Sequence, residues 1–234
     1  MNNKILVITS FNENLYNLYA YRFTQSYNWP FELKIFTEKT FIIKENFKIL
    51  QLNDDCKNFI ERNKHKTFKN YITDGVRFSY KVYSVTQAGI NSNYDMLIWV
   101  DADSVFYKPL TLDFINTNLY KENRMMTYLG RGEHYSECGF LLWNLKHKDT
   151  LDYFKEMKKM YDENLIYNES EYHDSYIWDL IRKKFERERG VLNIDIGSRK
   201  RQGHVQAESI LGKFFDHLKG PERKKLGRSW EFKL

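Results

Sequence analysis

LIWVDADSVF, residues 97–106, is the stretch that says most about how this chain folds. Its first four residues are bulky and apolar, which is typical of a strand covered on both faces in a parallel sheet. In such sheets the ligand-binding groups lie just past the carboxyl ends of the strands, and here Asp101 and Asp103 follow the apolar run. The stretch therefore predicts an α/β fold with a candidate site at the end of a central strand.

The two carboxylates are a candidate metal site. Because side chains alternate along an extended backbone, Asp101 and Asp103 point to one side and Ala102 points away. Two hard oxygen donors directed at one point can bind a divalent cation, which a diphosphate can share. The alternative is a solvated turn after the strand, since charged residues are common in any chain. The pair alone does not separate these two interpretations.

Length and composition favour one domain. The chain has 234 residues, 42% of them hydrophobic and 17% aromatic, which is enough for a large core. No apolar stretch of about 15 residues could form a signal peptide or a membrane span. Cys56 and Cys138 have no metal-ligand spacing, so we expect reduced thiols in the core. These features together predict a cytoplasmic protein.

The net charge of +6 is concentrated in the C-terminal part. Residues 182–234 contain 15 Lys/Arg and 7 Asp/Glu, or +8, which leaves −2 for residues 1–181. Such an excess can neutralise a phosphorylated ligand, lie on an anionic membrane surface or follow a nucleic acid backbone. Interleaved glutamates in RKKFERER, residues 182–189, favour a solvated helix face for that segment.

The chain opens with a β-α-β pattern. Strands are expected at residues 4–9 and 31–36, with a helix between them that ends at a Trp-Pro pair. A right-handed crossover would make the two strands parallel. The loop with Thr9, Phe11 and Asn12 and the loop at Thr37-Glu38 would then lie at the same sheet edge as Asp101. A nucleotide base can rest at this edge.

A helix over residues 74–89 carries Arg77 and Lys81, four positions apart on one face. Two neighbouring cations repel each other unless an anion lies between them, and two solvated side chains are the alternative. The remaining pattern predicts a polar helix at 53–71, helices near 112–118, 148–161 and 176–185, strands near 125–129, 137–144 and 191–197, and a flexible polar loop at 130–136.

The segment from Gly203 to Ser229 combines His204, His217, several glycines and many cations. It is poorly suited to form a free-standing helix, because glycine lowers helix propensity. We expect it to fold back over the site.

These pieces together resemble the GT-A glycosyltransferases, and more narrowly the glycogenin-like and bacterial galactosyltransferase-like branch known as family eight. The resemblance spans residues 4 to about 228 and rests on four segments: the DxD strand at 97–106, DGVRFSYK at 74–81, ECGFLLWN at 137–144 and HLKGPER at 217–223. Glu137 and Cys138 replace an asparagine and a serine of the family pattern. Arg223 stands where lysine is usual, which keeps the positive charge.

The resemblance implies a Rossmann-like, mixed but mainly parallel sheet flanked by helices, with the tail over the active site. It divides one GT-A domain into a nucleotide-binding half (about 1–110), an acceptor half (about 111–200) and a basic tail (about 201–234). The implied activity is metal-dependent transfer of a sugar from a nucleotide-diphosphate-sugar, with UDP-sugar favoured, with retention of configuration.

The resemblance also implies roles for individual residues. Mn²⁺, or Mg²⁺, would be held by Asp103 and His217, with Asp101 helping directly or through the ribose. The nucleotide-sugar would contact Arg77 and Lys81, and its diphosphate would contact the tail through Lys219, Gly220 and Arg223, with Lys224 as a further cation. Asp174 would face the acceptor, unless it is a simple helix N-cap. Glu137 would be the carboxylate on the β face of the donor.

Two other functions fit parts of the sequence. Asp-Ala-Asp-Ser-Val also fits the first motif of haloacid-dehalogenase-type Mg²⁺-dependent phosphatases, although that motif usually lies near the N-terminus. The basic tail could instead belong to a nucleic-acid-binding module. For a glycosyltransferase, the acceptor could be a glycan, a lipid-linked sugar or a modified nucleic acid, and peripheral membrane contact is compatible with the charge.

Overall fold

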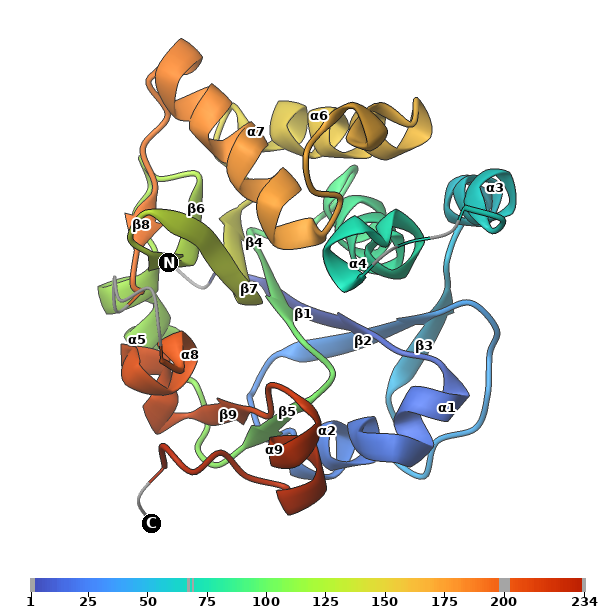
Figure 1. Ribbon diagram of the computed structural model, residues 1–234. Helices are drawn as coiled ribbons and strands as arrows, with labels where there is room; N and C mark the ends of the chain where they lie inside the picture. The colour runs from blue at the N-terminus through green and yellow to red at the C-terminus, as the bar shows by residue number, and fades with distance from the viewer. Residues whose placement is uncertain (1–2, 67, 69, 198–202, 233–234) are drawn as a thin grey trace.

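The protein is built on a seven-stranded sheet with the order β3-β2-β1-β4-β7-β6-β8 (Figure 1). The computed structural model describes residues 3–66, 68, 70–197 and 203–232. The strands of this sheet are β1 Ile5–Ser10, β2 Glu32–Thr37, β3 Lys48–Gln51, β4 Met96–Val100, β6 Met126–Arg131, β7 His134–Asn144 and β8 Ile194–Asp195. A separate two-stranded sheet pairs β5 Ser104–Phe106 with β9 Phe215–His217.

The sheet is mixed and mainly parallel, as the sequence predicts. β1 pairs in parallel with β2 and β4, and β2 pairs in parallel with β3. Strand β7 is antiparallel to both β4 and β6, while β8 is parallel to β6. The parallel strands β1, β2 and β4 end at the edge where Asp101 and Asp103 follow β4.

Both faces of β4 are buried, which explains its continuous apolar run. Leu97 and Trp99 pack into the core under the helices α3 Asp54–Asn63, α4 Gly75–Gly89, α6 Thr150–Asp162 and α7 Asp174–Arg189. Ile98 and Val100 pack into the core on the opposite face. That second core contains residues from η1 Tyr16–Ala20, α2 Tyr21–Ser26, η3 Ile115–Leu119 and α8 Val205–Glu208. Figure 1 shows these two layers above and below the sheet.

The remaining short helical segments are α1 Glu13–Leu15, η2 Tyr71–Thr73, α5 Leu112–Phe114, η4 Leu165–Asn168, η5 Ile210–Lys213 and α9 Pro221–Leu226. None of the helices in the described ranges is long and apolar enough to cross a membrane. Cys56 and Cys138 are free and buried, as predicted.

Several local predictions were wrong. The predicted flexible loop at 130–136 is the end of a hairpin, because β6 continues to Arg131 and pairs with β7 at His134. Gly132, with φ of +65°, supplies the tight turn between them. The polar helix expected at 53–71 ends at Asn63. Strands β3, β5 and β9 were not predicted, since each has only three or four residues.

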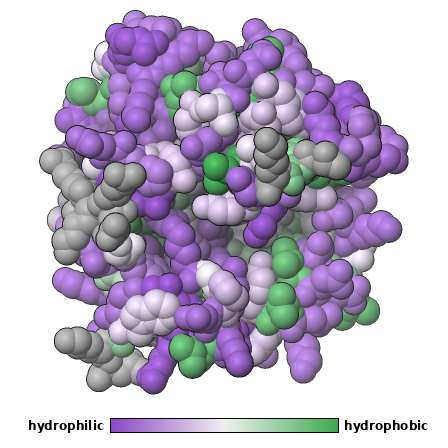
Figure 2. All heavy atoms as spheres, viewed as in Figure 1, coloured by the Kyte–Doolittle hydropathy of each residue, from purple (hydrophilic) through white to green (hydrophobic). Residues whose placement is uncertain are grey.

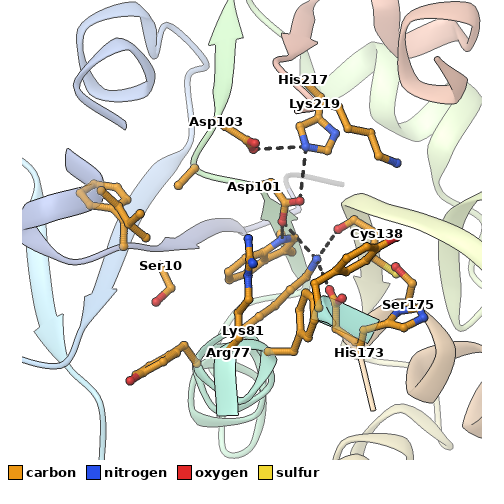
Figure 3. Close-up of a pocket in the computed structure, with 18 of the residues that line it drawn as sticks. Ser10, Arg77, Lys81, Asp101, Asp103, Cys138, His173, Ser175, His217 and Lys219 are labelled. Atoms are coloured by element: carbon orange, nitrogen blue, oxygen red, sulfur yellow. Dashed lines mark hydrogen bonds and ion pairs between the residues drawn. The ribbon is translucent and has the colours of Figure 1, made fainter. Parts of the chain in front are cut away.

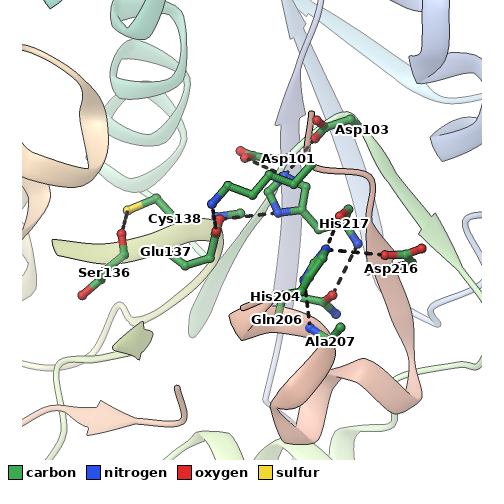
Figure 4. A network of polar contacts seen from close by, with 12 residues as sticks. Asp101, Asp103, Ser136, Glu137, Cys138, His204, Gln206, Ala207, Asp216 and His217 are labelled. Atoms are coloured by element: carbon green, nitrogen blue, oxygen red, sulfur yellow. Dashed lines mark hydrogen bonds and ion pairs between the residues drawn. The ribbon is translucent and has the colours of Figure 1, made fainter. Parts of the chain in front are cut away.

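The C-terminal segment folds back over the sheet edge, as predicted, and buried polar groups hold it there (Figure 4). The Asp216 carboxylate accepts hydrogen bonds from the backbone N–H and the hydroxyl of Ser229, both at 2.6 Å. The Gln206 side chain donates to the Phe215 carbonyl at 2.7 Å and accepts from the His217 N–H at 3.3 Å. These bonds fix β9, whose last residue is His217.

Candidate active site

A short ladder joins the two halves of the predicted metal site. Asp101 and Asp103 follow β4, and β5 begins directly after them at Ser104. Ser104 lies opposite His217 in the antiparallel pairing of β5 with β9. The N–H of Leu218 also donates to the Asp103 carbonyl at 2.8 Å. Backbone hydrogen bonds thus place His217 beside Asp103, although the two residues are far apart in the sequence.

The side chains of Asp101, Asp103 and His217 converge (Figure 3). His217 Nε2 lies 3.2 Å from Asp103 Oδ1 and 3.5 Å from Asp101 Oδ2. One potential ligand atom from each residue lies within 4.8 Å of the others. Two carboxylate oxygens and an imidazole nitrogen form a donor set that suits Mn²⁺ better than Mg²⁺. The three residues therefore fit the divalent cation that the sequence analysis predicts.

These groups carry opposite charges in a buried place. Burial alone lowers the pKa of His217, but the carboxylates of Asp103 and Glu137 outweigh burial and raise this pKa to about 10. Burial raises the pKa of Asp103, yet the adjacent positive charges hold it below its ordinary value. For Asp101 burial prevails, and its pKa is raised. The cluster thus includes carboxylates of different basicity around one imidazole.

Lys81 is a buried cation between two carboxylates. Its Nζ lies 2.7 Å from Asp174 Oδ2 and 3.1 Å from Asp101 Oδ1, and it also donates to the Cys138 carbonyl. Burial lowers the pKa of Lys81, but these carboxylates more than offset it and raise the pKa above its ordinary range. Trp99 Nε1 donates to the same Asp101 oxygen at 2.6 Å. Lys81 and Trp99 therefore fix the orientation of the Asp101 side chain.

Arg77 and Lys81 both line the cavity described below, and an anionic ligand between them stays a prediction. Arg77 is exposed, whereas Lys81 is buried. The anions beside Lys81 are the protein's own Asp101 and Asp174. Asp174 is not the helix N-cap: the cap is His173, whose Nδ1 accepts from the backbone N–H of the third helical residue at 3.3 Å.

Glu137 lies on β7 and is 6% exposed. Its Oε1 accepts from the Gly139 N–H at 2.9 Å and lies 3.4 Å from His217 Nδ1. Its Oε2 forms an ion pair with Lys219. Burial raises the pKa of Glu137, but the Lys219 and His217 charges lower it well below its ordinary value. Both carboxylate oxygens are thus engaged by the protein.

The tail contributes Lys219, Gly220 and Lys224 to the site, but not Arg223. Gly220 has φ of +86° and precedes α9. Lys224 Nζ lies 2.7 Å from Asp103 Oδ2. Arg223 instead pairs with Glu231 and stacks on the Trp230 ring, 3.5 Å from its centroid. Consecutive helical residues point about 100° apart, so α9 turns one cation toward the site and its neighbour away.

These side chains line a cavity of about 780 Å³. Figure 2 shows its mouth as a hollow in a mostly hydrophilic face. Of the predicted nucleotide-contacting residues, Phe11, Asn12, Arg77, Lys81, Asp101, Lys219 and Gly220 line the cavity. Among the described residues, Thr9 and Arg223 are outside this lining. Thr9 is fully buried and its neighbour Ser10 lines the cavity instead, because side chains alternate along β1.

The sequence analysis missed several residues of the lining, including Tyr80, Tyr135 and His173. Glu38, by contrast, was predicted at the sheet edge near the site: it directly follows β2 and lines the cavity, as expected at the carboxyl end of a parallel strand. Tyr135 lies in the segment predicted to be a loop, and the hairpin is what brings it to the cavity. Tyr80 lies in the segment DGVRFSYK and His173 directly precedes Asp174, so their closeness to predicted site residues was the available signal.

Comparison with sequence families and with curated proteins finds no match to this chain. Among solved structures, the chain is similar to a glycosyltransferase involved in the glycosylation of the major capsid of PBCV-1, with a TM-score of 0.51 and 14% identity over 95% of this chain and 99% of that one. It is also similar to the galactosyltransferase LgtC in complex with donor and acceptor sugar analogs, with a TM-score of 0.50 and 12% identity over 92% and 87% of the two chains.

The chain has a GT-A fold. The predicted fold class is therefore confirmed, including the mixed, mainly parallel sheet and the tail over the candidate site. At these identities the likeness concerns the GT-A fold itself. The fold places the carboxyl end of β4 at the cavity, which is where the Asp101, Asp103 and His217 cluster lies.

Proposed function

We propose that this protein is a metal-dependent glycosyltransferase that moves a sugar from a nucleotide-diphosphate-sugar, UDP-sugar above all, to an acceptor hydroxyl. One observation carries the proposal: in a GT-A fold, Asp101, Asp103 and His217 converge in the lining of a large cavity at the carboxyl end of β4. Carboxylate and imidazole donors at such a strand end suit a cation that a diphosphate can share. Nucleotide-sugar donors are large enough to require a cavity of this size.

The chemistry explains why these groups are needed. Breaking the bond from the anomeric carbon to the phosphate oxygen leaves negative charge on the diphosphate. Mn²⁺ held by Asp103 and His217, with Asp101 directly or through the ribose, would stabilise that charge by several kcal/mol as a Lewis acid. Lys224 contacts Asp103, and Lys219 pairs with Glu137, the carboxylate beside His217. Both lysines line the cavity and would donate charge-assisted hydrogen bonds to the diphosphate.

We assign the two substrates to different parts of the cavity. Phe11 and Asn12 follow β1 and lie near the nucleotide-binding edge, where Asn12 also contacts Glu38 at 3.4 Å. Within the proposal, residues about 1–110 bind the nucleotide and about 111–200 the acceptor. Asp174 lines the cavity, and within the proposal its carboxylate orients an acceptor hydroxyl. The tail assigned to about 201–234 includes residues 201–202 and 233–234, which lie outside the described residues.

Membership of family eight and retention at the anomeric carbon are further parts of the proposal and rest on the sequence resemblance, whereas a cytoplasmic location rests on the apolar pattern and the cysteines of the sequence. The anomeric configuration of the product, observed by proton NMR, tests retention. The phosphatase and nucleic-acid alternatives gain no support from the fold, since the two similar solved structures described above are glycosyltransferases. The acceptor could be a glycan, a lipid-linked sugar or a modified nucleic acid.

Thermal-shift screening tests the donor. A ligand present at 100 times its Kd stabilises the native state by about 2.7 kcal/mol, which corresponds to roughly 5–10 °C in Tm for a chain of this length. We expect UDP-sugars with Mn²⁺ to raise Tm by about this amount, and each component alone to raise it less. Asp103→Ala is the control that should lose the joint effect. Hydrolysis of a generic phosphomonoester without nucleotide-sugar turnover would contradict the proposal.

The tail gives a second test through two adjacent cations. We expect Lys224→Ala to raise the donor KM about 10- to 100-fold, because a charge-assisted hydrogen bond contributes about 1.5–3 kcal/mol. Arg223→Ala removes the same charge from the neighbouring position and should have a clearly smaller effect, since Arg223 pairs with Glu231 outside the cavity lining. Steady-state kinetics with varied donor separate the two variants. The reverse order of effects would assign the diphosphate contact to Arg223.

A further inference from the structure

The two ring nitrogens of His217 face different groups. Nε2 faces the carboxylates of Asp103 and Asp101, at 3.2 and 3.5 Å. Nδ1 faces Glu137 Oε1 at 3.4 Å, and among the described residues it has no partner in hydrogen-bonding geometry (Figure 4). Because the ring is 4% exposed, water has little access to Nδ1. A buried polar nitrogen is thus directed at a single carboxylate.

Strand β7 has a glycine where it lies against the His217 ring. Glu137 and Gly139 are two positions apart on β7, so they lie on the same face. A Cβ at Gly139 would lie 2.4 Å from His217 Nδ1 and 2.6 Å from Cε1, which is closer than real contacts allow. Any larger residue at this position would displace the imidazole. The glycine in ECGF therefore gives the His217 ring room to lie against β7.

The Glu137 carboxylate is itself held in place from both sides. Its Oε1 accepts from the Gly139 N–H at 2.9 Å. Its Oε2 pairs with Lys219, two residues beyond His217 on the tail. These contacts leave Glu137 little freedom to turn toward a sugar in the cavity. They hold Oε1 beside His217 Nδ1.

We propose that Glu137 is a positioning residue for His217 and not the carboxylate on the β face of the donor that the sequence resemblance implied. The inference rests on the proposed metal-dependent function. An imidazole that ligates through Nε2 carries its proton on Nδ1, and ligating histidines usually donate this second N–H to a carboxylate or carbonyl. Glu137 Oε1 is placed to accept it, and Lys219 holds Glu137 in the required orientation.

The test is the affinity for Mn²⁺, measured without nucleotide by the electron paramagnetic resonance signal of free Mn²⁺. Loss of such an outer-sphere partner typically weakens metal binding 10- to 100-fold. We expect Glu137→Gln to raise the Kd for Mn²⁺ within this range, with an unchanged circular dichroism spectrum. In a His217→Ala background, the same substitution should cause no further loss, because its effect passes through the imidazole. Glu186→Gln, which removes a carboxylate paired with Arg182 outside the cavity lining, should bind Mn²⁺ like the wild type.

Two of the possible outcomes distinguish the role of Glu137 from the proposed function. Wild-type affinity in Glu137→Gln, or an equal loss in both backgrounds, would overturn the positioning role. Mn²⁺ binding that follows the expected pattern, in a protein without nucleotide-sugar turnover, would leave the role of Glu137 standing and refute the glycosyltransferase proposal. A wild-type protein that does not bind Mn²⁺ would overturn both.

Discussion

Asp103→Ala is expected to abolish Mn²⁺-dependent nucleotide-sugar turnover while the fold stays intact. Asp103 offers the carboxylate nearest to His217 Nε2, at 3.2 Å, and we propose that both residues hold the cation. A Lewis acid contributes several kcal/mol to such a reaction, and about 4 kcal/mol corresponds to a thousandfold in rate. We therefore expect turnover to fall at least about a thousandfold. Release of the nucleotide diphosphate, followed by chromatography, measures it.

His217→Ala should have the same consequence, because β9 brings it to the same point from the other end of the chain. Asp95→Ala is a matched control. Asp95 immediately precedes the opposite end of β4, where it accepts from the Lys4 N–H at 2.7 Å and pairs with Lys146 at 2.8 Å. Its loss should leave most of the turnover. Activity retained in both Asp103→Ala and His217→Ala would refute the metal assignment.

Lys81→Met is expected to lower the free energy of unfolding by about 3 kcal/mol or more. Lys81 is 8% exposed and contacts both Asp101 and Asp174. Removing one partner of a buried ion pair leaves an uncompensated charge, which typically costs about 3–5 kcal/mol. Urea unfolding of the metal-free protein, followed by circular dichroism, measures the change.

Lys158→Met provides the comparison. Lys158 also contacts two carboxylates, Asp55 at 3.0 Å and Asp162 at 2.5 Å, but its side chain is 24% exposed against 9% for Lys81. Exposed pairs contribute about 0–1 kcal/mol, so we expect a loss near that range. Adding Asp174→Asn to Lys81→Met should recover part of the stability, since it removes one of the unpaired charges. Equal losses in the two lysine variants would show that burial is not the cause.

Local patterns were sufficient for much of the fold. The β-α-β opening, the apolar run of β4 and the helices α4, α6 and α7 follow from periodicity and capping, which depend on near neighbours. The very short strands did not follow from these patterns. β5 and β9 have three residues each, too few for an alternation to be recognised. Their pairing is a long-range contact that the local sequence does not encode.

The candidate site likewise has features that the local sequence predicts and features that depend on long-range contacts. Asp101 and Asp103 were predicted from the strand end and their short spacing, and His217 from the resemblance of HLKGPER to the family pattern. The sequence could not decide which cation of the tail faces the site, since the rotation of α9 depends on how Arg223 packs against Trp230 and Glu231. The sequence thus determined which side chains the DxD strand and the tail contribute to the candidate site. Only the tertiary structure decided which side chains contact one another, because the contacts depend on burial and on long-range strand pairing. The resulting pairs are Lys81 with Asp174, Lys224 with Asp103 and Glu137 with His217.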